Sequence, residues 1–269
     1  MTTDNVTQFH SVDQTTNPTY FTQFMDTSHG LPTAQRYKRV IMEHLAFQEG
    51  ATILDVGCGT GQDAQDLARA VGPHGRVVGI DNSETMLEVA RARAAQAQLP
   101  VEYVLADATH LPFVDGSFDG CQASRVLGHL RDPQWALAEM ARVARPGARI
   151  VVADGDIDLT AIDIADRVLA RKMIHAACDQ MQQGWIGRQM PRLFQQAGLS
   201  DIWVEGRVMQ LDYAFFQMVY SGILQRAQVA GSISEEELTR FWSDLEQAEQ
   251  EGHFFAGVVG FVVSGRKLL

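Results

Sequence analysis

The segment that most constrains the fold of this chain is a short apolar run followed by three closely spaced glycines. Residues 51–56, Ala-Thr-Ile-Leu-Asp-Val, have the composition of a buried strand, and Gly57, Gly59 and Gly61 lead into a helical pattern at 61–71. Glycines permit positive φ angles and a close approach of the backbone to a ligand. A dinucleotide-binding turn would place its third glycine at position 62, which is Gln62. The segment therefore predicts a ligand-binding strand–turn–helix unit and argues against a pyrophosphate site.

Strands and helices continue to alternate along the chain. Strand-like runs at 76–81, 101–107, 118–126 and 149–154 alternate with helical patterns at 83–96 and 133–147. This alternation is typical of a parallel, doubly wound α/β sheet. Beyond it we expect helices near 161–183 and 188–197, a strand at 202–211, helices near 213–229 and 234–251, and a strand at 254–267. The prediction is a Rossmann-like, mostly parallel seven-stranded sheet with two N-terminal helices and a helical insertion near its C-terminal strands.

The charge and the cysteine content exclude several kinds of partner. The formal net charge is −11 and the sequence pI is about 5.1, so the chain repels phosphate backbones and anionic lipids. We therefore expect no nucleic-acid or membrane partner. The three cysteines are far apart and lack the spacing of metal ligands, which predicts reduced thiols and no metal. The first 18 residues lack the pattern of an export signal, and the longest apolar stretch, Gly257–Val263, is too short to span a bilayer, so we expect a cytoplasmic protein.

Two aspartates that close predicted strands have the chemistry to bind a nucleoside. Asp81 lies 26 residues after Asp55, and Asp107 lies another 26 residues further on. A carboxylate at the end of the second strand can accept hydrogen bonds from both hydroxyls of a ribose. A carboxylate after the third strand can accept from an exocyclic amine, while the N–H of Ala108 can donate to a ring nitrogen. These groups together predict a site for adenosine, with a turn or cap role as the alternative for each aspartate.

Four motifs in a fixed order resemble one enzyme family. They are DVGCGTG at 55–61, VVGIDNS at 77–83, LADATHLPFVDGSFD at 105–119 and LRDPQWALAEMARVARPGARIVVAD at 130–154. Together they look like the class I S-adenosylmethionine-dependent methyltransferases, in particular the ubiquinone/menaquinone-biosynthesis type and its small-molecule relatives. Residues 1–18 are rich in Thr, Asn, Asp and Gln, which predicts a flexible or ligand-ordered tail, and the resemblance implies a single domain at 19–269. That domain would hold a helical cap at 19–47, a cofactor-binding core at 48–155, and acceptor-side helices with the last strands at 156–269.

The resemblance also implies which residues bind the cofactor, S-adenosyl-L-methionine, and its product, S-adenosyl-L-homocysteine. Gly57, Cys58, Gly59 and Gly61 would surround the methionine moiety, and Asp55 would orient its amino group. Asp81, followed by Asn82, would hold the ribose, Met86 would pack on the adenine, and Asp107 with Ala108 would read the adenine edge. Tyr20 and Arg36 of the cap are further candidates, because a guanidinium matches a carboxylate bidentately. Core packing is the alternative for Met86, and a solvated helix face is the alternative for Arg36.

Further residues are candidates for binding the methyl acceptor. Ser124 and Arg125, after the fourth strand, are candidates for contacts with the cofactor's amino-acid end and with the acceptor. His129 is the candidate catalytic base, because imidazole titrates near pH 7. Trp185, Arg188, Tyr213 and Tyr220 come from the variable half of the chain and are candidates for the wall of an acceptor pocket, with core packing as the alternative.

We therefore predict methyl transfer to a small, hydrophobic or aromatic molecule by direct displacement at the sulfonium methyl, with an oxygen, nitrogen or carbon atom as the acceptor. The first alternative is a methyltransferase-like cyclase that uses the bound cofactor without transferring its methyl group. A nicotinamide-dependent oxidoreductase is disfavoured by Gln62 and Asp107, and a cofactor-sensing regulatory subunit is a non-enzymatic alternative. The expected partner is a small-molecule acceptor, and a homodimer is left open.

Overall fold

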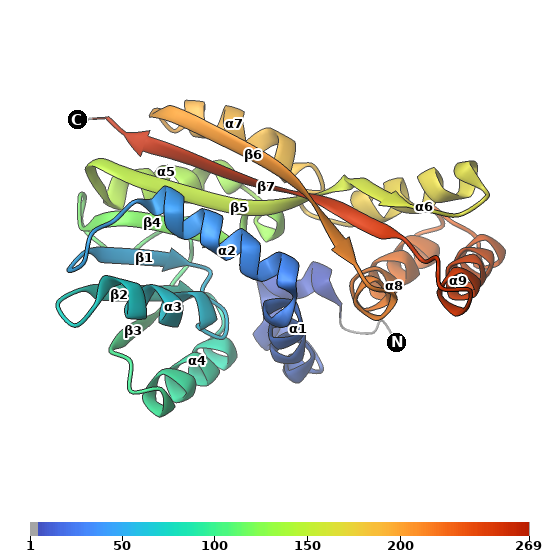
Figure 1. The fold of residues 1–269 in the computed structure, drawn as a ribbon, viewed down its shortest axis with the longest axis horizontal. Coiled ribbons are helices and arrows are strands. Elements are labelled where there is room, and N and C mark those ends of the chain that lie inside the picture. The colour runs from blue at the N-terminus through green and yellow to red at the C-terminus, as the bar shows by residue number, and fades with distance from the viewer. Residues whose placement is uncertain (1–4, 269) are drawn as a thin grey trace.

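The computed structural model describes residues 5–268 as a seven-stranded sheet flanked by helices (Figure 1). Its strands are β1 (Thr52–Val56), β2 (Arg76–Asp81), β3 (Val101–Leu105), β4 (Phe118–Ser124), β5 (Ala144–Ile162), β6 (Leu199–Leu211) and β7 (Ala256–Lys267). Their order in the sheet is β3-β2-β1-β4-β5-β7-β6. The pairs from β3 to β5 are parallel, whereas β7 runs antiparallel to both β5 and β6. The predicted doubly wound, mostly parallel sheet is confirmed.

Nine α-helices and two 3-10 helices are found within residues 5–268. The 3-10 helices are η1 (Val6–Gln14) and η2 (Leu127–His129); the α-helices are α1 (Pro18–Gly30), α2 (Pro32–Leu45), α3 (Gln62–Val71), α4 (Glu84–Gln96), α5 (Pro133–Val143), α6 (Arg167–Asp179), α7 (Ile186–Gln196), α8 (Tyr213–Val229) and α9 (Glu235–Gln250). The predicted break between the two N-terminal helices lies at Leu31, where Pro32 starts α2 with its fixed φ. Ser83 caps α4 as predicted, because its hydroxyl accepts from the Met86 N–H.

Helices cover both faces of the sheet and bury separate apolar clusters. On one face α2 and α3 pack Ile41 and Leu67 against β1, β2 and β5. On the other face α5 and α7 pack Met140 and Phe194 against the alternate residues of the same strands. Because parallel strands between two helical layers are buried on both sides, the runs that looked continuously apolar in the sequence are the central strands. This sandwich holds the carboxyl ends of the strands in fixed positions.

The three strands β5, β6 and β7 extend well beyond the rest of the sheet and carry α6, α8 and α9 at their far end (Figure 1). The sequence predicted that the fifth strand ends at Asp154 and that a helix begins near residue 161. The structure corrects this, because β5 continues to Ile162 and α6 begins at Arg167. The extension of β5 has a partner in the equally long β7, which it meets through Ala161 and Ile162 after a register shift. Helices α8 and α9 connect β6 to β7, as expected for an inserted helical segment.

The N-terminal segment differs from the expected flexible tail over the residues that the structure describes. Asn5 caps η1 in a capping box, and Val6 and Val12 are buried. The segment contacts α1, α4, α8 and η2 and so bridges both halves of the molecule. Its composition is polar, but its few apolar side chains face a common surface formed by distant elements. The part of the prediction that concerns residues 1–4 lies outside the described residues.

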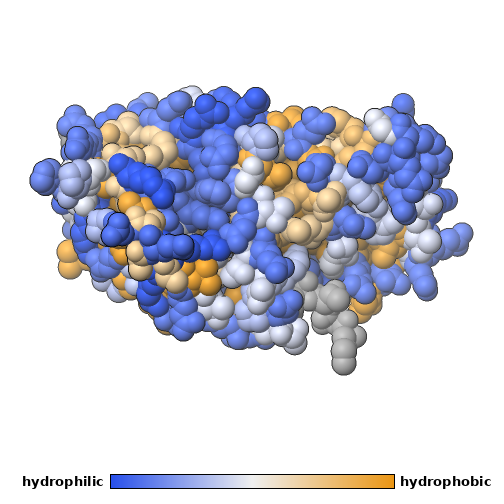
Figure 2. All heavy atoms as spheres, turned by 60° about the horizontal axis from the view of Figure 1, so that its bottom comes forward, coloured by the Kyte–Doolittle hydropathy of each residue, from blue (hydrophilic) through white to orange (hydrophobic). Residues whose placement is uncertain are grey.

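The surface is mostly hydrophilic on the face drawn in Figure 2, where apolar side chains form separate patches between charged ones. Individual exposed apolar residues are normal on soluble domains and need no partner to explain them. Within residues 5–268, none of the helices is both long enough and apolar enough to cross a membrane.

Candidate active site

A cavity of about 540 Å³ opens at the carboxyl ends of β1, β2, β3 and β4, passes the middle of β5 and continues toward β6, β7 and α8. In open α/β sheets this edge is where ligands bind. The lining residues come from η1, α1 and α2 as well as from the strand ends, so the cavity lies where the N-terminal segments meet both halves of the chain. One space therefore joins the glycine-rich turn to the helices of the C-terminal half.

The glycine-rich turn supplies part of the cavity wall. Gly57 and Gly59 line the cavity with φ of 67° and 51°. The Asp81 carboxylate braces this turn, because it accepts hydrogen bonds from the N–H of Gly59 at 2.8 Å and from the N–H of Ser83 at 3.0 Å. Burial raises the pKa of Asp81, and these backbone donors oppose the shift. Asp81 thus faces the cavity with its position fixed by two adjacent loops.

The other two members of the turn do not line the cavity. Gly61 caps α3 with a φ of 78°, and a β-carbon there would meet the Tyr103 hydroxyl at 2.4 Å. Cys58 is buried, and desolvation together with the nearby Asp55 raises its thiol pKa, so the thiol stays protonated. Both residues therefore shape the turn from behind.

The residues expected around an adenine lie together along the cavity. Asn82, Met86, Asp107 and Ala108 all line it. The Asp107 carboxylate also accepts from the N–H and the hydroxyl of Thr109 at 2.7 and 2.8 Å through one oxygen, so the turn-forming alternative applies as well. Met86 is only 2% exposed and packs with Val12 and Phe21, which shows that it serves core packing while bordering the cavity. The two interpretations of these residues are compatible.

Asp55 lies beneath the turn as a buried carboxylate with one unsatisfied oxygen. One oxygen accepts from the Gln122 amide at 3.0 Å, and the other has no hydrogen-bond partner within residues 5–268. Burial and the neighbouring Asp63 carboxylate raise the pKa of Asp55. Buried carboxylates of this kind favour a cationic group nearby. Asp55 itself does not line the cavity, so it would act from beneath the turn on a cationic group such as the ammonium at the methionine end of S-adenosylmethionine.

A lysine, rather than the predicted arginine, reaches the cavity from α2. Lys38 lines the cavity and contacts both His29 and Asp63, whereas Arg36 is exposed and is not among the lining residues. Residues two positions apart point to opposite sides of an α-helix, so only one of them can face inward. Tyr20 also lies outside the cavity wall, where its hydroxyl donates to the carbonyl of Met218 at 3.2 Å.

The end of β4 and the loop after it bring Ser124, Arg125 and His129 to the cavity wall. Arg125 has a φ of 60° and donates to the Ser28 hydroxyl at 2.7 Å, which ties the loop to α1. The ring of His129 has no hydrogen-bond partner within the described part of the chain and lies 5.3 Å from the ring of Phe9. Burial, followed by the charges of His10 and Arg125, lowers the pKa of His129 to about 4. The imidazole is therefore neutral and weakly basic at pH 7.

Asp154, at the centre of β5, is a cavity residue that the sequence analysis did not select. It lines the cavity with 7% exposure, and its two oxygens accept from the N–H groups of Gly128 and Gly155, each at 2.9 Å. Burial raises its pKa to about 6, against the effect of those hydrogen bonds and of Arg125. The pattern that selected Asp81 and Asp107, an aspartate closing a predicted strand, also fits Asp154 and could have found it.

Apolar side chains form the cavity wall beyond Asp154. Among them are Phe24, Met209, Leu211, Phe215, Val219 and Val258. Tyr220 also lines this end, and its hydroxyl lies 2.6 Å from that of Thr160. Since Thr160 donates to the carbonyl of Ile157, Tyr220 must donate to Thr160 and can offer a ligand only its oxygen lone pairs.

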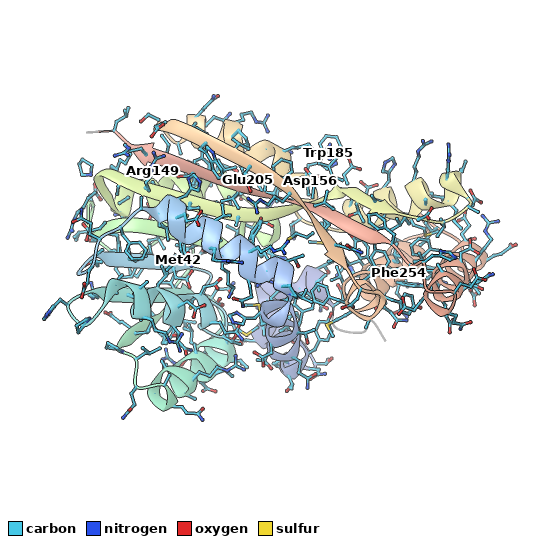
Figure 3. All side chains as sticks on the ribbon, viewed as in Figure 1. Met42, Arg149, Asp156, Trp185, Glu205 and Phe254 are labelled. Carbon is cyan, nitrogen blue, oxygen red and sulfur yellow. The ribbon has the colours of Figure 1, made fainter. Side chains whose placement is uncertain are left out.

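Three residues proposed for the acceptor wall lie elsewhere. The Arg188 guanidinium lies 4.8 Å from the centre of the Trp185 ring and pairs with the fully buried Asp156 at 2.7 Å. Figure 3 labels Trp185 and Asp156, the two residues that Arg188 joins. Tyr213 begins α8 and packs edge-on against Phe254. None of the three lines the cavity. They tie α7 to β5 and α8 to the segment before β7, because their aromatic and charged groups find partners there.

Comparisons with known proteins agree with this architecture. A family model described as "Methyltransferase domain" matches residues 53–147. The uncharacterized 37.1 kDa protein in transposon TN4556 of Streptomyces fradiae is 42% identical over 179 residues, which cover 66% of this chain and 51% of that protein. Methyltransferase GfsG of Streptomyces halstedii is 41% identical over 137 residues, which cover 50% of this chain and 49% of GfsG. The chain thus matches about half the length of these curated relatives.

Among solved structures, the fold is similar to that of phosphoethanolamine N-methyltransferase 2 from Haemonchus contortus in complex with S-adenosyl-L-methionine. The TM-score is 0.63 at 18% identity, and the match covers 97% of this chain and 60% of that one. The family model spans the glycine-rich turn, both strand-end aspartates and the loop after β4, which are the elements that form the cofactor end of the cavity. Residues 53–147 therefore match a methyltransferase domain, and the chain as a whole is similar in fold to a methyltransferase solved with S-adenosyl-L-methionine.

Proposed function

We propose that this protein transfers a methyl group from S-adenosylmethionine to a lipophilic small molecule. The observation that carries the proposal is the continuity of the cavity. Gly57, Gly59, Asp81 and Asp107 line one end of it and the apolar side chains of β6, β7 and α8 line the other. A cofactor site that opened only to water would need no apolar chamber beside it.

The cofactor end divides into groups of different chemistry. Asp81 would hold the ribose hydroxyls, and Asp107 with the Ala108 N–H would hold the adenine edge. Lys38 would attract the carboxylate of the methionine moiety, while Asp55 and Asp63 would favour its ammonium. When bound, S-adenosylmethionine supplies a methyl group already activated by a positively charged sulfur.

The protein's own contribution is alignment and the exclusion of water. Holding two reactants in line can lower a barrier by about 7–11 kcal/mol without any further catalytic group. Phe9 and His10 of η1 and Phe24 of α1 line the cavity, so the N-terminal segments separate it from solvent. The apolar wall favours acceptors whose bulk is hydrocarbon over charged metabolites.

Calorimetric titration with S-adenosylhomocysteine tests the cofactor assignment. We expect binding to the wild type and a loss of at least about tenfold in affinity in Asp81→Asn, because a hydrogen bond to a charged group contributes about 1.5–3 kcal/mol. Glu88→Gln, an exposed position on α4, is the control and should bind like the wild type. The absence of binding by folded wild-type protein would refute the proposal.

Incubation with methyl-labelled S-adenosylmethionine and a panel of lipophilic alcohols, phenols and amines tests the transfer itself. Labelled product that accumulates in step with S-adenosylhomocysteine supports methyl transfer. A product that forms without S-adenosylhomocysteine would instead support the cyclase alternative.

A further inference from the structure

We propose that Asp154 accepts the proton of the methyl acceptor, and that the acceptor therefore presents a hydroxyl group to this carboxylate. The inference rests on the proposed function and identifies the reacting group of its second substrate. It assigns to Asp154 the role that the sequence analysis gave to His129.

Asp154 is a buried carboxylate without a counter-ion. Its oxygens accept from the backbone N–H groups of Gly128 and Gly155, with a further backbone contribution from Leu127, and within residues 5–268 no lysine, arginine or histidine forms an ion pair with it. An unpaired buried carboxylate lowers the stability of the folded protein, whereas a hydrophobic side chain at the same position would not. A functional role at the cavity wall explains why an acidic side chain lies there.

The charged and titratable groups around Asp154 are otherwise engaged. Arg125, from the loop after β4, donates to Ser28. Tyr37, from α2, donates its hydroxyl to the carbonyls of Phe261 and Asp154 at 2.6 and 3.3 Å and leaves the carboxylate free. Asp156, two residues further along β5, is neutralised by Arg188, which pairs with both of its oxygens at 2.7 Å. The carboxylate of Asp154 is thus available to a ligand, and His129 of η2 is another titratable group that lines the same cavity.

Of the two candidate bases, His129 and Asp154, Asp154 is the better matched to neutral pH. Its pKa is raised to about 6 by burial, so it is ionised at pH 7 but still a stronger base than an ordinary carboxylate. The pKa of His129 is lowered to about 4, which weakens it as a base. The His129 ring remains able to orient an acceptor through a hydrogen bond.

The proton transfer and the methyl transfer need no group beyond the acceptor, Asp154 and the cofactor. The acceptor O–H bond breaks and its proton moves to a carboxylate oxygen of Asp154. The electron pair left on the acceptor oxygen forms the new O–C bond to the sulfonium methyl, and the C–S bonding pair returns to sulfur. The protonated Asp154 then loses its proton to solvent when the product leaves.

Fluorescence of bound 2-naphthol tests the proton transfer without requiring turnover. This lipophilic hydroxyl becomes strongly acidic in its excited state. Free 2-naphthol gives this proton to water, but 2-naphthol bound in a cavity that excludes water emits as naphtholate only when a base is within hydrogen-bond reach, so the emission of the bound fraction is the readout. With saturating S-adenosylhomocysteine, we expect bound 2-naphthol to emit from naphtholate in the wild type and from neutral naphthol in Asp154→Asn. His129→Gln should retain the naphtholate band. In the wild type alone, the band should disappear as the pH falls through about 6, which keeps the test valid even if Asp154→Asn folds poorly.

Three outcomes would overturn the inference: neutral emission from the wild type at pH 7, persistence of naphtholate in a folded Asp154→Asn protein, or loss of the band in His129→Gln alone. Failure of 2-naphthol to bind a wild type that binds S-adenosylhomocysteine would also overturn it, because the cavity would then not take a lipophilic hydroxyl. Failure to bind S-adenosylhomocysteine would refute the proposed function instead, so the two are distinguished.

Discussion

Gly57 combines a conformational and a steric requirement in one residue. Its φ is 67°, and a β-carbon there would meet a methyl group of Val126 at 2.5 Å. We expect Gly57→Ala to lower the free energy of unfolding by about 1–3 kcal/mol more than Gly116→Ala. Gly116 is a matched control, because its φ is 66° but a β-carbon there would have nothing within 4 Å. Urea unfolding of both variants measures the difference, and equal losses would show that Val126 moves aside.

His129 links the cavity to the pH dependence of stability. Its folded pKa of about 4 lies below the unfolded value near 6.5, so the unfolded chain binds more protons between these values. The stability due to neutral His129 is fully present above pH about 6.5 and is lost as the pH falls toward 4. Between pH 7 and 5 the wild type should lose at most about 2 kcal/mol more than His129→Gln. Urea unfolding at both pH values checks this, with the exposed His74→Gln as control; parallel losses would contradict the buried, neutral assignment.

Sequence spacing placed the turn residues and the strand-end carboxylates, because parallel strands bring their carboxyl ends to one edge. It did not distinguish Arg36 from Lys38, since the side of α2 that faces the cavity is set by how Tyr37 and Ile41 pack on the sheet. Asp154 carried the same signal as Asp107, but its meaning depends on burial and on missing ion pairs. Those properties appear only once distant elements are assembled.

The 3-10 helix η1 supplies an N-terminal cap to α4, which lies far along the chain. The Asp13 carboxylate accepts from the Ser83 hydroxyl at 2.6 Å and from the Glu84 N–H at 2.8 Å at the start of α4. We expect Asp13→Ala to destabilise the docking of η1 by about 0.5–2 kcal/mol, the usual contribution of an N-terminal cap. Hydrogen exchange of the η1 amides measures this as faster exchange. Asp66→Ala, at an exposed pair on α3, should leave η1 unchanged, and an equal effect there would contradict the capping role.

Elements whose partners are local in the repeating strand–helix pattern were predictable, and those with distant partners were not. The polar composition of η1 suggested a tail, yet Phe9 packs against Phe21 and Phe24 of α1 with ring centroids 4.9 and 5.5 Å apart. The extension of β5 likewise depends on β7, about a hundred residues later. Hydrophobic periodicity reports one segment at a time, so it does not register these pairings.

The cavity connects two parts of the molecule whose apolar cores are otherwise separate. The sandwich buries its own clusters on both sheet faces, while α6, α8 and α9 bury another around Phe216 and Phe241. Residues of η1 and α1 line the cavity between them and also contact α8. A ligand in this position therefore acts on the cooperativity of the entire chain.

This arrangement predicts how the protein unfolds with ligand. At about 100 times its dissociation constant, S-adenosylhomocysteine should stabilise the folded state by about 2.7 kcal/mol, which corresponds to a rise of roughly 5 °C in Tm. Because the binding cavity spans both halves, the N-terminal segment and α8 should gain protection together. Differential scanning calorimetry with hydrogen exchange on η1 and α8 measures both effects, and Asp81→Asn at the same ligand concentration is the control with a reduced shift. Protection confined to η1 and α4 would mean that the ligand closes only the nucleoside end and leaves the apolar chamber independent of it.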